Sequence, residues 1–209
     1  MRLYFKPGTC SMSSRIVLNE LGLGFDAIKV DTESGSMENG VDYRSINPKG
    51  YVPALELTDG AVLTENPAIL QFLADVRPEA GLAPAHGTLE RSRLQEWLNF
   101  TSSELHKAFS PYFRSHPLDE TDKEQVEIRL ARCIGDVEHG LSDGRDFILG
   151  NSFTVADAYL FVVLNCSNLI GFNLECWPHV SAYVKRLAAR PSTRQAMRQE
   201  GLLTDEVAA

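Results

Sequence analysis

Cys10 is the residue of this sequence with the clearest capacity for chemistry. It lies in the polar segment PGTCSMS, directly before a run of residues with helical periodicity. The unpaired amides and the positive dipole end at the start of a helix stabilise a thiolate. Ser13 stands where a CxxC motif would have its second thiol, so redox chemistry at Cys10 would need a thiol from outside the chain. A small buried structural cysteine is the alternative interpretation.

Two other segments have the residue types to bind an amino acid or a short peptide. Val52 precedes a proline, and a cis bond there would leave the Val52 backbone free to pair with a peptide-like ligand. The sequence alone slightly favours an ordinary trans proline at the start of a strand. Glu65 and Asn66 open a predicted helix, where asparagine and helix amides can hold a carboxylate and glutamate can hold an ammonium. Simple capping, with Thr64 as the N-cap residue, is the alternative.

Three uncharged polar side chains follow one face of a predicted helix over residues 88–109. Asn99, Ser103 and His106 are spaced at i, i+4 and i+7, which brings them together on an α-helix. Hydrogen-bonding groups in this arrangement suggest one wall of a ligand site. A solvated helix face is the alternative, and an isolated histidine is more often structural than catalytic.

The elements that must position these residues begin with a mixed α/β domain. Alternating and helical patterns predict strand, helix, strand, two hairpin strands and helix at residues 2–6, 11–21, 25–31, 54–57, 61–63 and 65–75. The first three elements favour a parallel unit with a right-handed crossover. Asp59 and Gly60 are a hairpin signal, so the next two strands should be antiparallel. Residues 32–40 are expected to form a polar loop. The βαβ–ββα order is thioredoxin-like.

The second half of the chain has only helical patterns. Residues 76–88 concentrate proline and glycine and form the expected domain boundary. After them, helices are predicted at residues 88–109, 121–141, 154–170, 178–189 and 192–200. Thr154 and Asp157 have the spacing of a capping box, which predicts a structural role at the start of the most apolar helix. We therefore expect a thioredoxin-like domain over residues 1–80 and an all-α domain over residues 87–209.

Composition excludes several classes of function. A formal net charge of −8 argues against a general nucleic-acid-binding protein, which needs a basic face. The start of the chain has no apolar secretory segment, and no apolar stretch approaches membrane-spanning length. The expected location is the cytoplasm, where the four cysteines stay reduced, and their spacings do not indicate a metal site.

Taken together, these segments resemble the beta-class (bacterial) cytosolic glutathione S-transferases over essentially the whole chain. The resemblance rests on MRLYFKPGTCSMS, INPKGYVPALEL, LTENPAILQFLAD, LQEWLNFTSSELHKAFSP and FTVADAYLFVVL, in the family's order. It implies glutathione as co-substrate, a hydrophobic electrophilic small molecule as acceptor, no metal, and a homodimer. Apolar residues on the 88–109 helix, beyond what one core-facing stripe requires, also favour a homodimer: Leu94, Trp97, Leu98 and Phe100.

The resemblance also implies roles for individual residues. Cys10 matches the active-site cysteine beside the glutathione sulfur, and Val52 matches the residue that pairs with its cysteinyl part. Glu65 and Asn66 match the pair that holds the γ-glutamyl end, although serine is more usual at position 66. The family's contacts from the helical domain match Asn99, Ser103, Glu104 and His106, with Lys107 a weaker candidate, and some are expected across the dimer interface.

One position departs from the family pattern. Many members have a lysine near the glycyl carboxylate of glutathione, where this chain has Gly35. The loss of one exposed ion pair costs up to about 1 kcal/mol, or about fivefold in binding. Lys49 is the candidate replacement.

The expected reaction is attack of glutathione thiolate on an electrophile, RX plus glutathione giving HX plus the thioether. Thiol–disulfide exchange through Cys10 is a possible second activity. In both, helix-terminal amides, Ser11 and the His106 region would stabilise thiolate. The alternatives are a glutathione-dependent isomerase, dehalogenase or ether-cleaving enzyme, and a non-catalytic binding module of the same fold.

Overall fold

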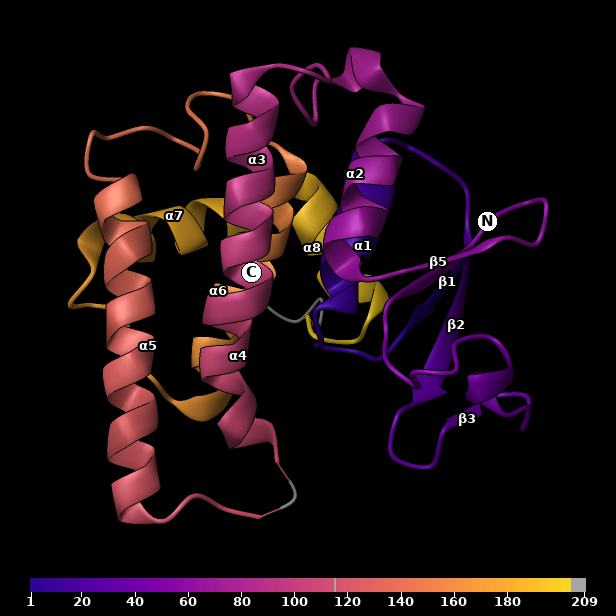
Figure 1. The fold of residues 1–209 in the computed structure, drawn as a ribbon, viewed down its shortest axis with the longest axis horizontal. Coiled ribbons are helices and arrows are strands. Elements are labelled where there is room, and N and C mark those ends of the chain that lie inside the picture. Colours follow the sequence, from indigo (N-terminus) through magenta and orange to yellow (C-terminus); the bar gives the residue numbers. More distant parts are fainter. Residues whose placement is uncertain (115, 204–209) are drawn as a thin grey trace, which may run out of the picture. The chain divides into compact units, whose positions relative to one another are not determined.

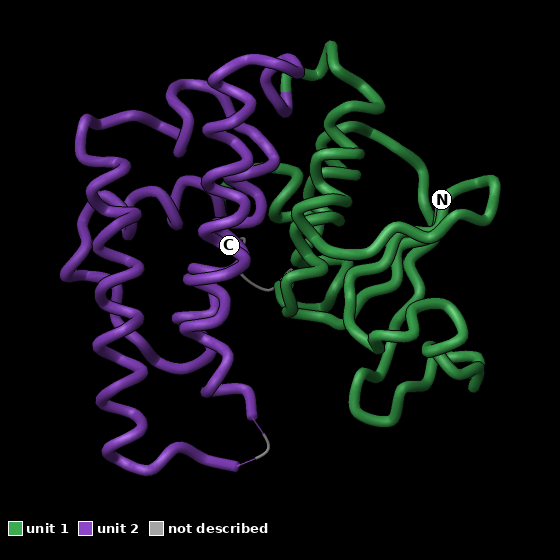
Figure 2. Tube along the Cα trace, viewed as in Figure 1, with its two compact units in different colours: residues 1–81, 189–209 green, residues 82–188 purple. Residues whose placement is uncertain are grey.

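The computed structural model describes residues 1–114 and 116–203, and the chain divides into two compact units (Figure 2). The first unit comprises Met1–Gly81 together with Ala189–Ala209, and the second comprises Leu82–Ala188. Residues 204–209, which the expected helical domain includes, lie outside the described residues. The domain ranges expected from the sequence stay predictions, because the unit that contains the sheet also includes a segment from the far end of the chain.

A five-stranded mixed sheet forms the first unit, in the order β3-β2-β1-β4-β5 (Figure 1). Its elements in chain order are β1 (Arg2–Phe5), α1 (Ser11–Glu20), β2 (Asp26–Asp31), β3 (Ser36–Met37), η1 (Tyr43–Ser45), β4 (Ala54–Glu56), β5 (Val62–Thr64), α2 (Asn66–Val76), η2 (Pro78–Ala80) and α8 (Pro191–Gln199). Strand β1 pairs with β2 in parallel and with β4 antiparallel, and β4 and β5 form an antiparallel hairpin. The predicted thioredoxin-like order is confirmed.

Successive side chains of β1 point alternately to the two faces of this sheet, and both faces are buried at this strand. Leu3 and Phe5 are buried, with Arg15 of α1 lying over the Phe5 ring, whereas Tyr4 points to the opposite face. Helices α1 and α2 lie side by side (Figure 1). There the short 3-10 turn η1 packs the fully buried ring of Tyr43 against Tyr4, with 5.6 Å between ring centroids. Strand β3 was not predicted, because its two residues lie within the polar segment 32–40 and are defined by pairing with β2.

All named elements among the described residues of the second unit are helices. Its helices are α3 (Leu89–Phe100), the π-helical segment η3 (Thr101–Leu105), α4 (His106–Phe109), the 3-10 turn η4 (Ser110–Phe113), α5 (Glu120–Gly140), α6 (Val155–Ile170) and α7 (Pro178–Ala188). The predicted single helix over residues 88–109 is therefore interrupted by one π-helical turn. Among the described residues, no helix is long and apolar enough to cross a membrane.

The start of α6 is held by a buried carboxylate. Asp157 accepts hydrogen bonds from the Thr154 amide and hydroxyl, the Ile148 amide and the Tyr183 hydroxyl, each at 2.8 Å. The predicted capping box is present. Burial raises the pKa of the Asp157 carboxyl, and its donors oppose the rise. Because each donor left unpaired in the core would cost about 1–3 kcal/mol, the role of this group is structural.

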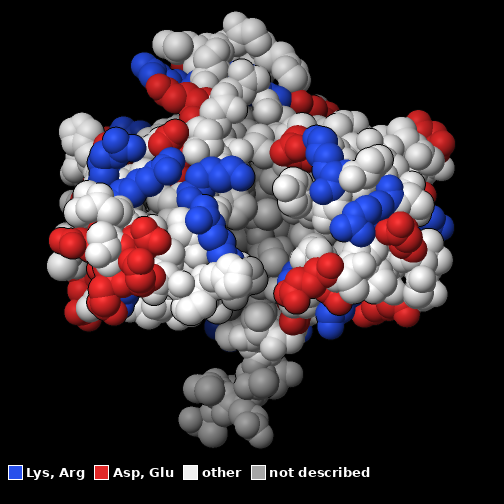
Figure 3. Space-filling view, turned by 60° about the horizontal axis from the view of Figure 1, so that its bottom comes forward, with Lys and Arg blue, Asp and Glu red and all other residues white. Residues whose placement is uncertain are grey.

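Surface charge is mixed in sign. On the face shown in Figure 3, acidic and basic side chains are interspersed, in keeping with the formal net charge of −8. The apolar residues used above to argue for a dimer are largely covered within the helical unit. Leu94 and Leu98 are buried, and a Cβ added at Gly140 would lie 2.9 Å from the Trp97 ring. The homodimer thus rests on the family resemblance.

Candidate functional site

Cys10 is the N-cap residue of α1 and its side chain is half-buried. The preceding loop is closed by short contacts to the Lys6 carbonyl, which accepts from the Thr9 hydroxyl at 2.8 Å and from the Ser11 hydroxyl at 3.1 Å. The Ser11 side chain is fully buried by this closure. The suggestion that Ser11 stabilises a thiolate is therefore less well supported than a role in shaping the loop.

The thiol of Cys10 is directed at the segment between η1 and β4. Its Sγ donates to the carbonyl oxygen of Val52, and the two atoms lie 3.5 Å apart. The Val52–Pro53 bond is cis, as the family resemblance implies and contrary to the slight preference for trans from sequence alone. The first unit therefore places a thiol beside the backbone of Val52, two residues before β4.

Asn66 connects the starts of α2 and α1. Its buried Nδ2 donates to the Cys10 carbonyl at 3.2 Å and to the Ser13 hydroxyl at 2.6 Å, and its Oδ1 accepts from the Ser14 hydroxyl at 2.9 Å. The side chain is thus engaged within the protein. The groups that remain for a ligand are the backbone N–H groups at the start of α2.

Glu65 precedes α2 with φ of 69°, and among the described residues it alone, apart from glycines, has a positive φ. This left-handed conformation costs of order 1–3 kcal/mol and is concentrated at ligand sites. The N-cap residue is Glu65 and not Thr64, and its side chain makes no capping bond. Instead Lys49 Nζ lies 2.7 Å from Glu65 Oε1, so the glutamate already has a cation beside it.

The Arg44 side chain lies where a side chain at position 35 would be. Gly35 has φ of +75°, and a Cβ there would clash with Nη1 of Arg44. The guanidinium therefore fills the space into which a side chain at position 35 would extend. Sequence reasoning missed Arg44, because nothing in the spacing of residues 35 and 44 indicates that they meet.

The residues of the predicted polar stripe differ in exposure and in their partners. Asn99 and Ser103 are exposed, and the Ser103 hydroxyl donates to the Asn99 carbonyl at 2.9 Å. His106 follows the π-helical turn, which changes the helical phase, and its half-buried ring meets Tyr159 edge-on, with Nδ1 3.3 Å from the hydroxyl. Burial, with a smaller effect of Lys107, lowers the pKa of His106 below its ordinary value. The imidazole is therefore neutral at pH 7.

Glu104, on η3, faces α5. Its Oε2 lies 3.3 Å from Arg129 Nη2 and 3.7 Å from Arg132 Nη2. Exposed pairs of this kind contribute little to stability, so the carboxylate remains available to exchange partners. The structure thus groups Cys10, Val52, Glu65 and Asn66 in the first unit and Asn99, Ser103, Glu104 and His106 in the second. Among the described residues, no three His, Cys, Asp or Glu side chains gather as metal ligands would.

Comparison with known proteins follows the same division. Residues 8–76 match the family model described as glutathione S-transferase, N-terminal domain, and residues 100–191 match glutathione S-transferase, C-terminal domain. The chain is 43% identical to glutathione S-transferase GstA of Escherichia coli O157:H7, over 97% of this chain and 100% of the relative.

Solved structures agree. A bacterial beta-class glutathione S-transferase from Sphingomonas chungbukensis has 43% identity and a TM-score of 0.92, with 97% of this chain and 100% of that chain covered. A sphingomonad glutathione S-transferase complexed with glutathione has 41% identity and a TM-score of 0.91, with the same coverage.

Proposed function

Because the chain belongs to the glutathione S-transferase family, we propose that it transfers glutathione to small hydrophobic electrophiles. In the reaction, glutathione thiolate attacks the electrophilic carbon of RX, the new carbon–sulfur bond forms, and X leaves with the bonding electron pair. The proton released from the glutathione thiol appears as HX. The observation that carries the proposal is the Cys10 thiol at the start of α1, 3.5 Å from the Val52 carbonyl.

In this proposal, glutathione lies as an extended peptide against Val52, with its sulfur at the N-terminal end of α1. Helix-terminal amides stabilise the thiolate there without any metal. The γ-glutamyl end lies at the start of α2, where amides hold its carboxylate and Glu65 holds its ammonium. The strained backbone of Glu65 supports a ligand-binding role for this residue.

The glycyl carboxylate needs a positive charge that Gly35 does not supply. Lys49 is already paired with Glu65, whereas the Arg44 guanidinium lies at the position of a side chain from residue 35. We therefore assign the glycyl end to Arg44. From the family resemblance, we propose that Asn99, Ser103, Glu104 and His106 also contact glutathione and that neutral His106 takes part in catalysis.

Glutathione-dependent disulfide exchange is a second proposed activity. Among the described residues, Cys10 is the one cysteine of the first unit, so an outside thiol must resolve any disulfide that it forms. The Cys10 thiolate attacks the glutathione sulfur of a mixed disulfide, forming the Cys10–glutathione disulfide and releasing the other thiolate. A second glutathione thiolate then attacks, regenerating Cys10 and producing glutathione disulfide.

The test is titration calorimetry with reduced glutathione and with S-methylglutathione, followed by turnover of an activated aryl chloride, an epoxide and a mixed disulfide. The proposal predicts binding of both peptides, because the backbone contacts do not need the thiol, and turnover of the chloride. Absence of glutathione binding would overturn it. Isomerisation or ether cleavage in place of conjugation would instead support the alternative enzymes, and binding with no turnover would support a binding module.

The assembly and the location of the enzyme are proposals of the same kind. We propose a homodimer in the cytoplasm that binds neither nucleic acid nor membrane. Sedimentation at micromolar concentration tests the dimer, since a single species of 23.2 kDa would contradict it.

A further inference from the structure

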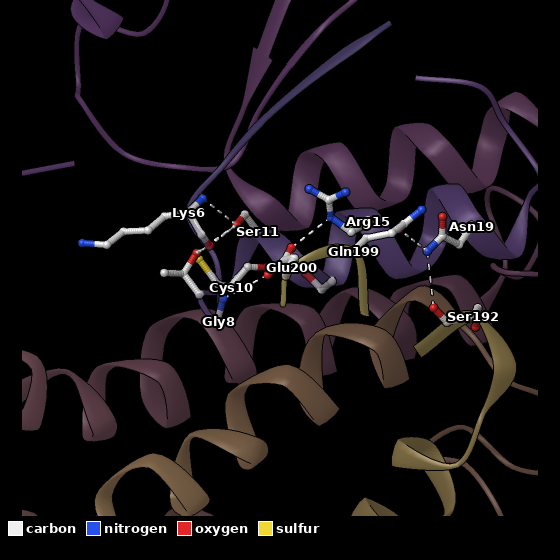
Figure 4. Close-up of polar contacts among 11 residues, drawn as sticks. Lys6, Gly8, Cys10, Ser11, Arg15, Asn19, Ser192, Gln199 and Glu200 are labelled. Atoms are coloured by element: carbon white, nitrogen blue, oxygen red, sulfur yellow. Dashed lines mark hydrogen bonds and ion pairs between the residues drawn. The ribbon is translucent and has the colours of Figure 1, made fainter. Parts of the chain in front are cut away.

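Glu200 contributes a buried carboxylate to the loop that precedes Cys10. It follows α8 directly, and its Oε2 accepts a hydrogen bond from the backbone N–H of Gly8 at 2.9 Å. Its Oε1 accepts from Nε of Arg15, on α1, at 3.0 Å (Figure 4). The side chains of Arg15 and Glu200 are only 4% and 0% exposed. The far end of the chain is therefore attached to the loop two residues before the candidate active-site thiol.

Burying the Arg15–Glu200 ion pair removes two charges from water, which costs free energy. Burial raises the pKa of the Glu200 carboxyl, while Gly8 and Arg15 oppose that rise. The Arg15 guanidinium lies over the Phe5 ring at 4.1 Å, and its Nη2 is buried with no hydrogen-bond partner among the described residues. Apolar side chains often replace a buried ion pair without loss of stability. Stability alone therefore does not account for a carboxylate here.

The loop offers a specific reason for the carboxylate. At one end of the loop, two hydroxyl groups donate hydrogen bonds to the Lys6 carbonyl. At the other end, the Asn66 side chain donates to the Cys10 carbonyl. Gly8 lies between them with φ of +71°. Glu200 accepts the N–H of this middle residue. It thus fixes the part of the loop that the local contacts leave free.

We propose that Glu200 is a positioning residue for Cys10: it holds the Gly8 N–H and thereby fixes the loop that presents the thiol to glutathione. The inference rests on the proposed function for its last step. Arg15 contributes to the position of this loop indirectly, because its ion pair favours the charged form of the Glu200 carboxyl and orients it.

The opposite end of the contact between α1 and α8 provides a control. Asn19 Nδ2 donates to the Ser192 carbonyl at 3.4 Å and to Gln199 Oε1 at 3.1 Å, without touching the loop (Figure 4). Asn19→Ala therefore weakens the same helix pair and leaves the Gly8 bond intact.

The experiment compares two double variants that both lack the ion pair. Arg15→Met with Glu200→Gln keeps an acceptor oxygen for Gly8, whereas Arg15→Met with Glu200→Met, of similar shape, does not. For each, and for Asn19→Ala, we would measure three quantities in the full chain: exchange of the Gly8 amide by NMR, the rate of Cys10 alkylation by iodoacetamide, and the dissociation constant of glutathione. Denaturant unfolding reports the stability of each variant.

We expect the Gln variant to retain slow Gly8 exchange and to bind glutathione within about threefold of wild type. The Met variant should lose Gly8 protection, change its alkylation rate and bind glutathione about tenfold more weakly, as expected for the loss of one hydrogen bond to a buried acceptor. Asn19→Ala should change stability alone. Identical behaviour of the two double variants, or loss of Gly8 protection with unchanged affinity, would overturn the inference. Exchange and alkylation need no glutathione, so a wild-type protein that fails to bind it would refute the proposed function separately.

Discussion

The Cys10 thiol donates a hydrogen bond to the carbonyl oxygen of Val52, with 3.5 Å between the two atoms. Only the protonated thiol can donate this bond, so a thiolate at Cys10 must give it up. The same carbonyl belongs to the residue against which glutathione is proposed to lie. The two proposed reactions therefore differ in the nucleophile beside the Val52 carbonyl. In conjugation it is the glutathione sulfur, and in disulfide exchange it is the Cys10 sulfur.

Cys10 should be alkylated faster at pH 7 than Cys133 and Cys166. Burial raises the pKa of Cys166 to about 11 and also raises that of Cys133. Cys176 is exposed and would compete, so the measurement belongs in a Cys176→Ser background. Iodoacetamide labelling across pH, followed by peptide mass spectrometry, gives the rates. Faster labelling of Cys133 or Cys166 would contradict the assignment of Cys10 as the reactive thiol.

Two exposed cations of the first unit should affect glutathione binding in opposite directions. Lys49→Met should strengthen binding about twofold, because Lys49 competes with the ligand ammonium for Glu65. Arg44→Gln should weaken it about fivefold, because the glycyl carboxylate loses its partner. Each variant removes one positive charge, so calorimetry of the pair controls for net charge. Weaker binding by Lys49→Met would assign the carboxylate to Lys49 instead.

Gly35→Lys, which introduces the family's usual lysine, should not improve binding. At φ of +75° a non-glycine residue costs roughly 1–2 kcal/mol, and its Cβ would displace the Arg44 guanidinium. We expect a lower free energy of unfolding and glutathione affinity no better than wild type. Calorimetry and urea unfolding would show this. A tighter-binding Gly35→Lys protein of unchanged stability would mean that Arg44 does not occupy this place in solution.

His106 should make the folded protein less stable at acid pH. Burial lowers its pKa in the folded state, so below about pH 6.5 the unfolded chain binds a proton that the folded chain resists. The free energy of unfolding of wild type should therefore fall relative to that of His106→Gln as pH decreases from 8 to 5. Urea unfolding of both proteins over this range gives the difference in their free energies of unfolding at each pH. The contributions of the other titrating groups cancel in this difference. A difference that is constant with pH would contradict the lowered pKa.

Local patterns predicted most of this fold. Alternation at residues 2–6, the Asp59–Gly60 hairpin and the Thr154–Asp157 capping box each depend on neighbours in sequence, and the corresponding elements are present. Strand β3 escaped prediction because it is defined by a pairing partner. The π-helical turn η3 escaped as well, since residues 101–105 fit an α-helix equally well by periodicity.

The position of Cys10 at a helix start was predictable from the sequence, and the contacts around it were not. Sequence and resemblance together indicated Cys10, and the structure places it at a helix start. The engagement of Asn66 with α1, the approach of Arg44 to Gly35 and the bond from Gly8 to Glu200 each join residues that are distant along the chain. No spacing rule reports such contacts, because they depend on how complete elements pack.

The central claim is that Cys10 is the attacking sulfur in disulfide exchange, whereas glutathione supplies it in conjugation. The most direct measurement is the ratio of the two activities in Cys10→Ala and His106→Ala, each with its glutathione dissociation constant. We expect Cys10→Ala to bind glutathione, to lose exchange completely and to retain measurable conjugation, and His106→Ala to lose part of its conjugation. A Cys10→Ala protein that binds glutathione but loses both activities equally would show that conjugation also requires Cys10, and would contradict the mechanism.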